Sequence, residues 1–341
     1  MGESIASTFM TTVRVGVIGF GLMGRTHAEA FHRDPRATLV AVADPHLSEQ
    51  PASEGNLDAQ EEFVLPSDVA IHASATDLLA RDDIDAVVVA APTVFHADLA
   101  VAVLESGRHL LVEKPLALDS TDAARVARAG AARPDVVAWP AMCMRFWPEW
   151  TYLRDGLRSG QWGAVQQARF ERIGAIPSWG GDFFKDHTKS GGAILDLHIH
   201  DVDFVRSCFG APDGLQAFGR RGVSGGFDHV HAVFEYEGIP GGVHAEGAWL
   251  EGDVPFMLRF MVVCERAVLR YDISATPTLT VHATDGSGPV DLPDFPEGSC
   301  YQHQAAAFLD AVLGQNVSDL TLEDGVHAIS LVEAERSALS S

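Results

Sequence analysis

Three ionisable residues, Lys114, Asp196 and His200, have the types and spacing that proton transfer requires. Lys114 directly follows the expected strand 109–113. Asp196, His200 and Asp203 stand at positions i, i+4 and i+7, which share one face of a helix. Apolar residues surround that face, so a partly desolvated imidazole is expected there. Such a histidine can act as a general base while a carboxylate holds its tautomer. We therefore predict that Lys114 and His200 form a proton-handling pair, with a carboxylate of the stripe beside the histidine.

Each feature also has a structural interpretation. A lysine before a proline at a strand end can be a solvated turn residue, and the two aspartates could pair locally around a core histidine. The pairs His198/His200 and His229/His231 resemble metal ligands. However, residues two apart on a helix point about 200° away from each other. No third ligand is evident beside the second pair, so no metal site is expected.

The stretch 13–44 has the order strand, glycine loop, helix, strand and acid. Strands are expected at 13–18 and 38–43, and a helix at 26–31. The loop between the first strand and the helix consists of Gly19, Phe20, Gly21, Leu22, Met23 and Gly24. Gly19 permits the tight turn, Gly21 lets a pyrophosphate approach the backbone, and Gly24 lets the helix pack closely. The pattern predicts a dinucleotide-binding unit; a glycine turn in an ordinary α/β core is the alternative.

Asp44, at the end of the second strand, indicates which dinucleotide is bound. Its carboxylate can accept hydrogen bonds from the two hydroxyls of an adenosine ribose, while the helix N-terminus offers N–H groups to the phosphates. The same carboxylate repels a 2′-phosphate, and no arginine follows in Asp44-Pro45-His46. NAD is therefore the predicted cofactor, and NADP is disfavoured.

The composition excludes several classes of partner. The chain has 341 residues, of which 47% are hydrophobic, enough for two domains with sizeable cores. A formal net charge of −23 argues against nucleic acids and anionic membranes, because both require a basic face. Cys143, Cys208, Cys264 and Cys300 are scattered, which is typical of reduced thiols. Neither a secretory signal nor a membrane span is evident, so a cytoplasmic enzyme is expected.

Two domains are expected after a loose N-terminal tail at residues 1–12. Residues 13–140 alternate strands and helices, which predicts a Rossmann-type, doubly wound parallel sheet. Residues 141–341 contain a run of strands joined by short turns, which predicts a large, mostly antiparallel sheet. These strands are expected at 166–173, 215–218, 229–236, 242–250, 256–264, 267–271 and 279–283. Helices are expected at 193–208, 302–313 and 322–339. Because both domains combine helices with a sheet, the expected fold class is α/β.

Several motifs occur together with the glycine loop. They are His27, Pro92-Thr93 with His96, Glu113-Lys114-Pro115, and Gly191-Gly192 followed by Asp196, His200 and Asp203. On these motifs the chain resembles the Gfo/Idh/MocA family, the glucose–fructose oxidoreductase and inositol dehydrogenase group. The resemblance places Lys114, Asp196 and His200 in the catalytic positions. Pro92, Thr93, His96, Glu113 and Lys114 are expected to lie beside the cofactor. One departure is His198, where many members carry glycine; it could contact the substrate or only fill a gap.

The resemblance implies NAD(P)-dependent oxidation of a secondary hydroxyl of a sugar or cyclitol. In this mechanism His200 takes the hydroxyl proton, Lys114 stabilises the developing alkoxide, and Asp196 orients the pair. Substrate contacts are expected from Arg145, Trp147, Trp179, His187 and Asp203. The loop 179–187 could equally be an ordinary interdomain loop.

The resemblance also implies an open sheet that serves as an oligomer interface, so a homodimer or homotetramer is expected. Two other functions remain open. One is a non-catalytic regulator that senses NAD and sugar, and the other is a redox-neutral glycosidase that retains its NAD.

Overall fold

Six short apolar strands form the first sheet of the computed structural model, which describes residues 12–47, 63–178, 180–315 and 318–340. In the order in which they pair, the strands are β3 (Ala70–His72), β2 (Ala37–Ala43), β1 (Val13–Ile18), β4 (Ala86–Val89), β5 (His109–Val112) and β6 (Ala138–Pro140). All of the pairs are parallel. The predicted doubly wound parallel sheet is thereby confirmed. The expected tail 1–12, except Thr12, lies outside the described residues.

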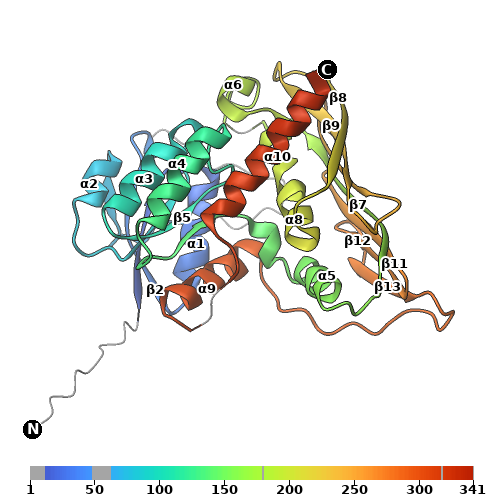
Figure 1. Cartoon of the computed structure of the whole chain (residues 1–341). Helices are drawn as coiled ribbons and strands as arrows, with labels where there is room; N and C mark the ends of the chain where they lie inside the picture. Colours follow the sequence, from blue (N-terminus) through green and yellow to red (C-terminus); the bar gives the residue numbers. More distant parts are fainter. Residues whose placement is uncertain (1–11, 48–62, 179, 316–317, 341) are drawn as a thin grey trace, which may run out of the picture.

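Helices connect these strands and cover the sheet (Figure 1). They are α1 (Leu22–Arg33), α2 (Ala75–Leu79), α3 (His96–Glu105) and α4 (Ser120–Ala131), with a short 3₁₀ turn, η2, at Thr93–Phe95. Strands β1, β4 and β5 are buried almost completely, as strands covered on both faces must be. Their carboxyl ends therefore lie along one edge, where ligands bind in open α/β sheets.

The second sheet has seven strands. In spatial order they are β13 (Leu279–Ala283), β12 (Ala267–Asp272), β11 (Met257–Cys264), β7 (Val165–Ala175), β10 (Val243–Leu250), β9 (Phe227–Glu235) and β8 (Gly214–Arg221). Only the central pair, β7 and β10, is parallel, and the other five pairs are antiparallel. This confirms the predicted mostly antiparallel sheet and the α/β fold class.

Helices pack on one face of the second sheet, the face toward the first domain (Figure 1). They include α5 (Pro148–Arg158), which follows the 3₁₀ turn η3 (Cys143–Phe146), then α6 (His187–Ser190), α7 (Ala193–Asp196) and α8 (Ile199–Phe209). The sequence analysis did not predict α5. It begins at Pro148, which suits the first helical position, and it buries Trp150 and Leu153.

The last two helices, α9 (Cys300–Val312) and α10 (Leu322–Ser340), join the domains. Phe308 of α9 packs against Phe31 of α1 and Trp139 of β6, with ring centroids 6.1 and 5.5 Å apart. Helix α10 runs between the domains (Figure 1) and contacts α4 on one side and α8 and β8 on the other. Among the described helices, none combines the length and the apolar character needed to cross a membrane.

Candidate active site

The expected helix 193–208 is interrupted, and this interruption builds the centre of the site. The helix stops at Asp196 and resumes at Ile199, because the N–H of His198 bonds to the carbonyl of Ala193 and the N–H of His200 bonds to Leu197. The prediction of one continuous helix was therefore wrong. In an unbroken helix the N–H of His200 would bond to the carbonyl oxygen of Asp196. Here that oxygen is left for another donor.

Lys114 supplies this donor. Its amine, at the carboxyl end of β5, donates to the carbonyl oxygen of Asp196 at 2.7 Å and to its carboxylate Oδ1 at 2.9 Å. Both side chains are largely but not completely buried, with exposed fractions of 14% and 20%. The pair therefore joins the first domain to the second and keeps a side open to a ligand.

His200 follows at the first turn of α8, partly exposed. Its Nδ1 atom is enclosed and bonds to no group in the described part of the chain. Burial, followed by the positive charges of Lys114 and Arg172, lowers the pKa of His200 well below its usual value. The imidazole is thus neutral at neutral pH, the state in which it can accept a proton.

The sequence analysis missed Arg172. Its guanidinium, which is buried, donates to both carboxylate oxygens of Asp201 at 2.9 and 3.0 Å. It lies in β7 at a position facing the core, between the inward-facing Phe170 and Gly174. That alternation was the available signal, because a charged residue at an inward position of a strand needs a buried partner.

The glycine loop has the geometry predicted for dinucleotide binding. Gly19 has a φ of +85°, and a Cβ atom there would lie 2.5 Å from the backbone nitrogen of Ala91. A Cβ atom at Gly24 would overlap the carbonyl oxygen of Gly19. Gly21 is the N-cap of α1, so the N–H groups of Leu22 and Met23 face the loop without helical acceptors. Gly19 and Gly24 therefore leave no room for a side chain in this loop, as the predicted roles of the two glycines require.

Asp44 lies at the end of β2 and supports the same loop. Its carboxylate accepts the N–H of Phe20 at 2.7 Å and the N–H of His46 at 2.7 Å. The side chain is mostly buried. The carboxylate therefore holds the glycine loop at the end of the strand where the ribose is predicted to lie.

Glu113 and His96 bind the ends of the strands together. Glu113 is buried, and its Oε1 lies 2.7 Å from Nε2 of His27 in α1. Burial opposes ionisation of Glu113, but the hydrogen bond from His27 and the nearby positive charges together outweigh it and lower the pKa of Glu113. His96 lies between the carbonyl oxygens of Pro115 and Ala91, both at 2.7 Å. Burial lowers its pKa, so the neutral ring donates to one of the two at a time.

Pro92 and Thr93 form the turn between β4 and α3, with Thr93 mostly buried at the start of η2. Together with Lys114 and the glycine loop, they follow neighbouring strands of the parallel sheet, at the carboxyl edge where a cofactor would lie.

The predicted substrate residues are dispersed. Arg145 and Asp203 form a buried two-bond ion pair, at 2.7 and 2.8 Å, and Arg145 also contacts Asp324 of α10. Trp147 packs edge-on to Tyr271 of β12, at 6.3 Å between centroids. His187, at the start of α6, donates through Nδ1 to the carbonyl of Ser224 at 3.1 Å. Trp179 lies outside the described residues.

His198, the residue that departs from the family pattern, contacts Glu335 of the last helix. It is completely buried, and its Nε2 lies 3.2 Å from Oε2 of Glu335 in α10. Burial opposes protonation of His198, but the Glu335 carboxylate and the charge of Asp201 together outweigh it and raise the pKa of His198. A Cβ atom added at Gly247 of β10 would lie 2.7 Å from that of His198. His198 therefore fills a gap and ties α10 to the site.

His229 bonds instead to Glu246, at 2.9 Å, and His231 to His244, at 3.2 Å. In the described part of the chain, no group of three or more histidine, cysteine, aspartate or glutamate side chains is arranged to hold a metal ion.

Comparisons with known proteins cover both domains. Residues 13–139 match the GFO_IDH_MocA model, an oxidoreductase family with an NAD-binding Rossmann fold, and residues 150–270 match the GFO/IDH/MocA C-terminal domain. The chain is 32% identical to inositol 2-dehydrogenase of Rhizobium meliloti (strain 1021) over 200 residues, which are 58% of this chain and 56% of that protein. It is 31% identical to scyllo-inositol 2-dehydrogenase (NAD(+)) of Bacillus subtilis (strain 168) over 204 residues, 58% of this chain and 54% of that protein. The matched stretch thus spans about half the length of these relatives.

A shorter stretch of 109 residues is 38% identical to a glycosyl hydrolase family 109 protein of Shewanella sp. (strain W3-18-1), over 32% of this chain and 24% of that protein. Among solved structures, levoglucosan dehydrogenase in complex with NADH and levoglucosan has a TM-score of 0.80 at 17% identity, covering 96% of this chain and 97% of that one. GenD2 from gentamicin A biosynthesis, in complex with NAD, has a TM-score of 0.78 at 23% identity and covers 100% of this chain and 98% of that one. At these sequence identities the two structures show that the fold is shared and nothing more.

Proposed function

The chain belongs to the Gfo/Idh/MocA oxidoreductase family, and we propose that it is an NAD-dependent dehydrogenase that oxidises a secondary hydroxyl of a sugar or cyclitol. The observation that carries this proposal is the contact between Lys114 and Asp196 across the two domains, with the neutral His200 one turn away. The inositol dehydrogenases of Rhizobium meliloti and Bacillus subtilis support the choice of substrate class.

In the proposed mechanism the substrate hydroxyl lies between Lys114 and His200. The ring nitrogen Nε2 of His200 takes the hydroxyl proton, because Nδ1 is enclosed. The ammonium of Lys114 stabilises the negative charge that develops on the oxygen. Asp196 holds that ammonium through its carboxylate and its backbone carbonyl, so the charge is positioned before the substrate arrives.

The cofactor would be held by the glycine loop, with its pyrophosphate at the N-terminus of α1 and its adenosine ribose at Asp44. When bound, NAD supplies the hydride acceptor. The turn at Pro92 and Thr93 and the buried His96 and Glu113 would shape the nicotinamide end, since they lie beyond the neighbouring strands β4 and β5.

A substrate screen tests the proposal. Inositols, aldoses and anhydrosugars would be offered with NAD, and NADH formation would be followed by absorbance. We expect NADH with at least one polyol and its loss in Lys114→Ala. Tight NAD binding without NADH formation from any polyol would favour a sensing role for the protein.

The second candidate is the redox-neutral glycosidase, favoured by the short match to the glycosyl hydrolase family 109 protein. It would retain NAD through purification and release sugar from a glycoside without net NADH formation. Liberated sugar from a chromogenic glycoside, at constant NADH absorbance, would select this function over the dehydrogenase.

A further inference from the structure

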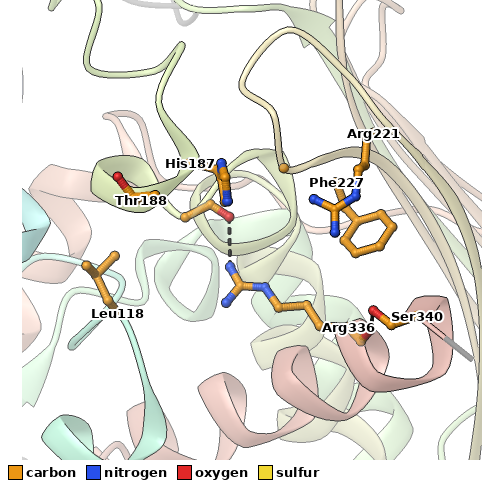
Figure 2. A pocket seen from close by; sticks show the side chains of 9 residues that line it. Leu118, His187, Thr188, Arg221, Phe227, Arg336 and Ser340 are labelled. Atoms are coloured by element: carbon orange, nitrogen blue, oxygen red, sulfur yellow. Dashed lines mark hydrogen bonds between the residues drawn. The ribbon is translucent and has the colours of Figure 1, made fainter.

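A pocket of about 330 Å³ lies beside α6, between α10 and the connection from β8 to β9. Its lining includes His187 and Thr188 of α6, Arg221 at the end of β8, Phe227 at the start of β9, and Leu118 (Figure 2). Pockets for small ligands typically begin at about 300 Å³. The volume therefore suits a small molecule better than a bare ion.

Arg336 reaches this pocket from α10. One Nη2–H donates to the carbonyl oxygen of Gly191 at 2.7 Å (Figure 2). The guanidinium makes no other hydrogen bond and no carboxylate ion pair with a residue that the structure describes. Nearby carboxylates are engaged elsewhere: Glu333 bonds to Ser120, and Glu335 bonds to His198. Arg336 thus lines the pocket with further N–H donors and without an ion pair to a described carboxylate.

The half-buried position of Arg336 makes this arrangement unfavourable in the free protein. Burial lowers its pKa, and the charges of Glu333 and Glu335 offset that only in part. A guanidinium stays charged in proteins, so its incomplete compensation favours a bound anion.

Arg221 approaches from the opposite side of the pocket (Figure 2). Its Nη1 donates to the carbonyl of Gly225 at 2.9 Å, and its guanidinium lies over the Phe227 ring, 4.7 Å from the centroid. No carboxylate among the described residues pairs with it either. Because the hydroxyls of Thr188 and Ser340 already donate to Asp186 and to the Arg336 carbonyl, the two arginines are the free donors.

We propose that this pocket binds a small molecule through a phosphate or carboxylate group, held between Arg336 and Arg221, with Leu118 and Phe227 against its apolar part. A guanidinium can bind a carboxylate or phosphate through two parallel N–H groups. Two guanidiniums on opposite walls of the pocket can therefore hold one such group between them. None of Lys114, Asp196 and His200 lines this pocket, and the proposed binding goes beyond the proposed dehydrogenase activity.

Calorimetric titration with inorganic phosphate at constant ionic strength tests the site. The unaltered protein should show saturable binding, and Arg336→Gln and Arg221→Gln should each weaken it about tenfold or more, the effect of losing a charge-assisted hydrogen bond. The matched control is Arg220→Gln, an exposed neighbour in β8 that removes the same charge outside the pocket. It should bind phosphate like the unaltered protein.

A parallel titration with glucose 6-phosphate separates the sources of the anion. Tighter binding than that of phosphate, reduced by Phe227→Ala, would identify an organic phosphate as the ligand; equal binding would identify the free anion. No saturable binding to the unaltered protein, or the same loss in Arg220→Gln as in Arg221→Gln, would overturn the proposal. Arg221 is exposed, so its variant gives an answer even if Arg336→Gln fails to fold. NAD affinity reports on folding in every variant.

Discussion

The amine of Lys114 donates to Asp196 twice, once to the carboxylate and once to a backbone carbonyl that the interrupted helix leaves unpaired. The lysine of the first domain is thereby fixed by two oxygens of the second. An ammonium held by two acceptors is already oriented when charge develops on a substrate oxygen, which is how preorganised sites lower a barrier.

Removing either proton-handling group should slow turnover by about 10²- to 10⁴-fold. Lys114→Ala and His200→Ala should both do so. The double variant should lose less turnover than the product of the two single fold-decreases, because both groups act on one hydroxyl. The hydride-transfer rate at saturating NAD, with the substrate that the screen identifies, is the measurement. NAD dissociation constants should stay the same, since the glycine loop is untouched. Unchanged turnover in His200→Ala would exclude His200 from the mechanism.

As the pH is lowered, the activity should begin to fall only below the pH range in which an unperturbed histidine titrates. Burial, then Lys114 and Arg172, lowers the pKa of His200, so the base stays neutral as the pH falls through 6.5, its unperturbed value. Lys114→Met removes a cation and should move the titration of His200 to higher pH. NMR titration of the His200 ring in both proteins measures this. A shift to lower pH in Lys114→Met would contradict the assigned cause.

Asp44→Ser should relax the preference for NAD over NADP, because it removes the charge that repels a 2′-phosphate. It should also weaken binding of both cofactors, since the carboxylate holds the N–H of Phe20 in the loop. Dissociation constants for both cofactors, in both proteins, separate the two effects. If the unaltered protein binds NAD and NADP equally well, Asp44 does not select the cofactor.

His198 and Gly247 should be coupled through their contact. Gly247→Ala places a methyl 2.7 Å from the His198 Cβ, and overpacking of this kind typically costs about 1–3 kcal/mol. In a His198→Gly background the same substitution should cost less. Urea unfolding of the four proteins gives the interaction energy. Equal costs in both backgrounds would show that the two residues do not compete for space.

The exposed face of the second sheet should carry the contacts between subunits. Phe218 of β8 and Met261 of β11 are 61% and 41% exposed on it, and we expect a homodimer or homotetramer. Replacing both by aspartate should shift the sedimentation coefficient toward the monomer. Ile71→Asp, at an equally exposed position of β3, is the control. If the unaltered protein sediments as a monomer at micromolar concentration, the predicted homodimer or homotetramer is wrong.

Most of the fold could be predicted from local sequence patterns. Apolar strands, glycine turns and helical spacing predicted both sheets, because each element is consistent with its own sequence. Helix α5 was missed because Trp150, Tyr152 and Leu153 resemble strand residues until Pro148 is taken as the start of a helix. The break after Asp196 was not predicted, because the residues 193–208 have a helical pattern throughout; it appears only in the backbone hydrogen bonds of His198 and His200.

The predicted catalytic residues Lys114, Asp196 and His200 lie close together in the structure, whereas Arg145 and Asp203 bind each other. The sequence shows that both are charged and near the site, but only the tertiary packing decides which partner satisfies a buried charge. Arg172 was missed for the same reason: its partner, Asp201, belongs to a helix far along the chain.

The packing of α9 on the first domain has a consequence for biosynthesis. Once residue 140 has left the ribosome, all six parallel strands are available to fold, yet Phe31 and Trp139 still lack Phe308, which packs against them in the finished protein. At 5–20 residues per second, that partner follows roughly 10 to 30 s later. During this interval the nascent domain exposes an apolar surface to chaperones and to other nascent chains. Translation speed and chaperone supply should therefore influence how much of the protein matures.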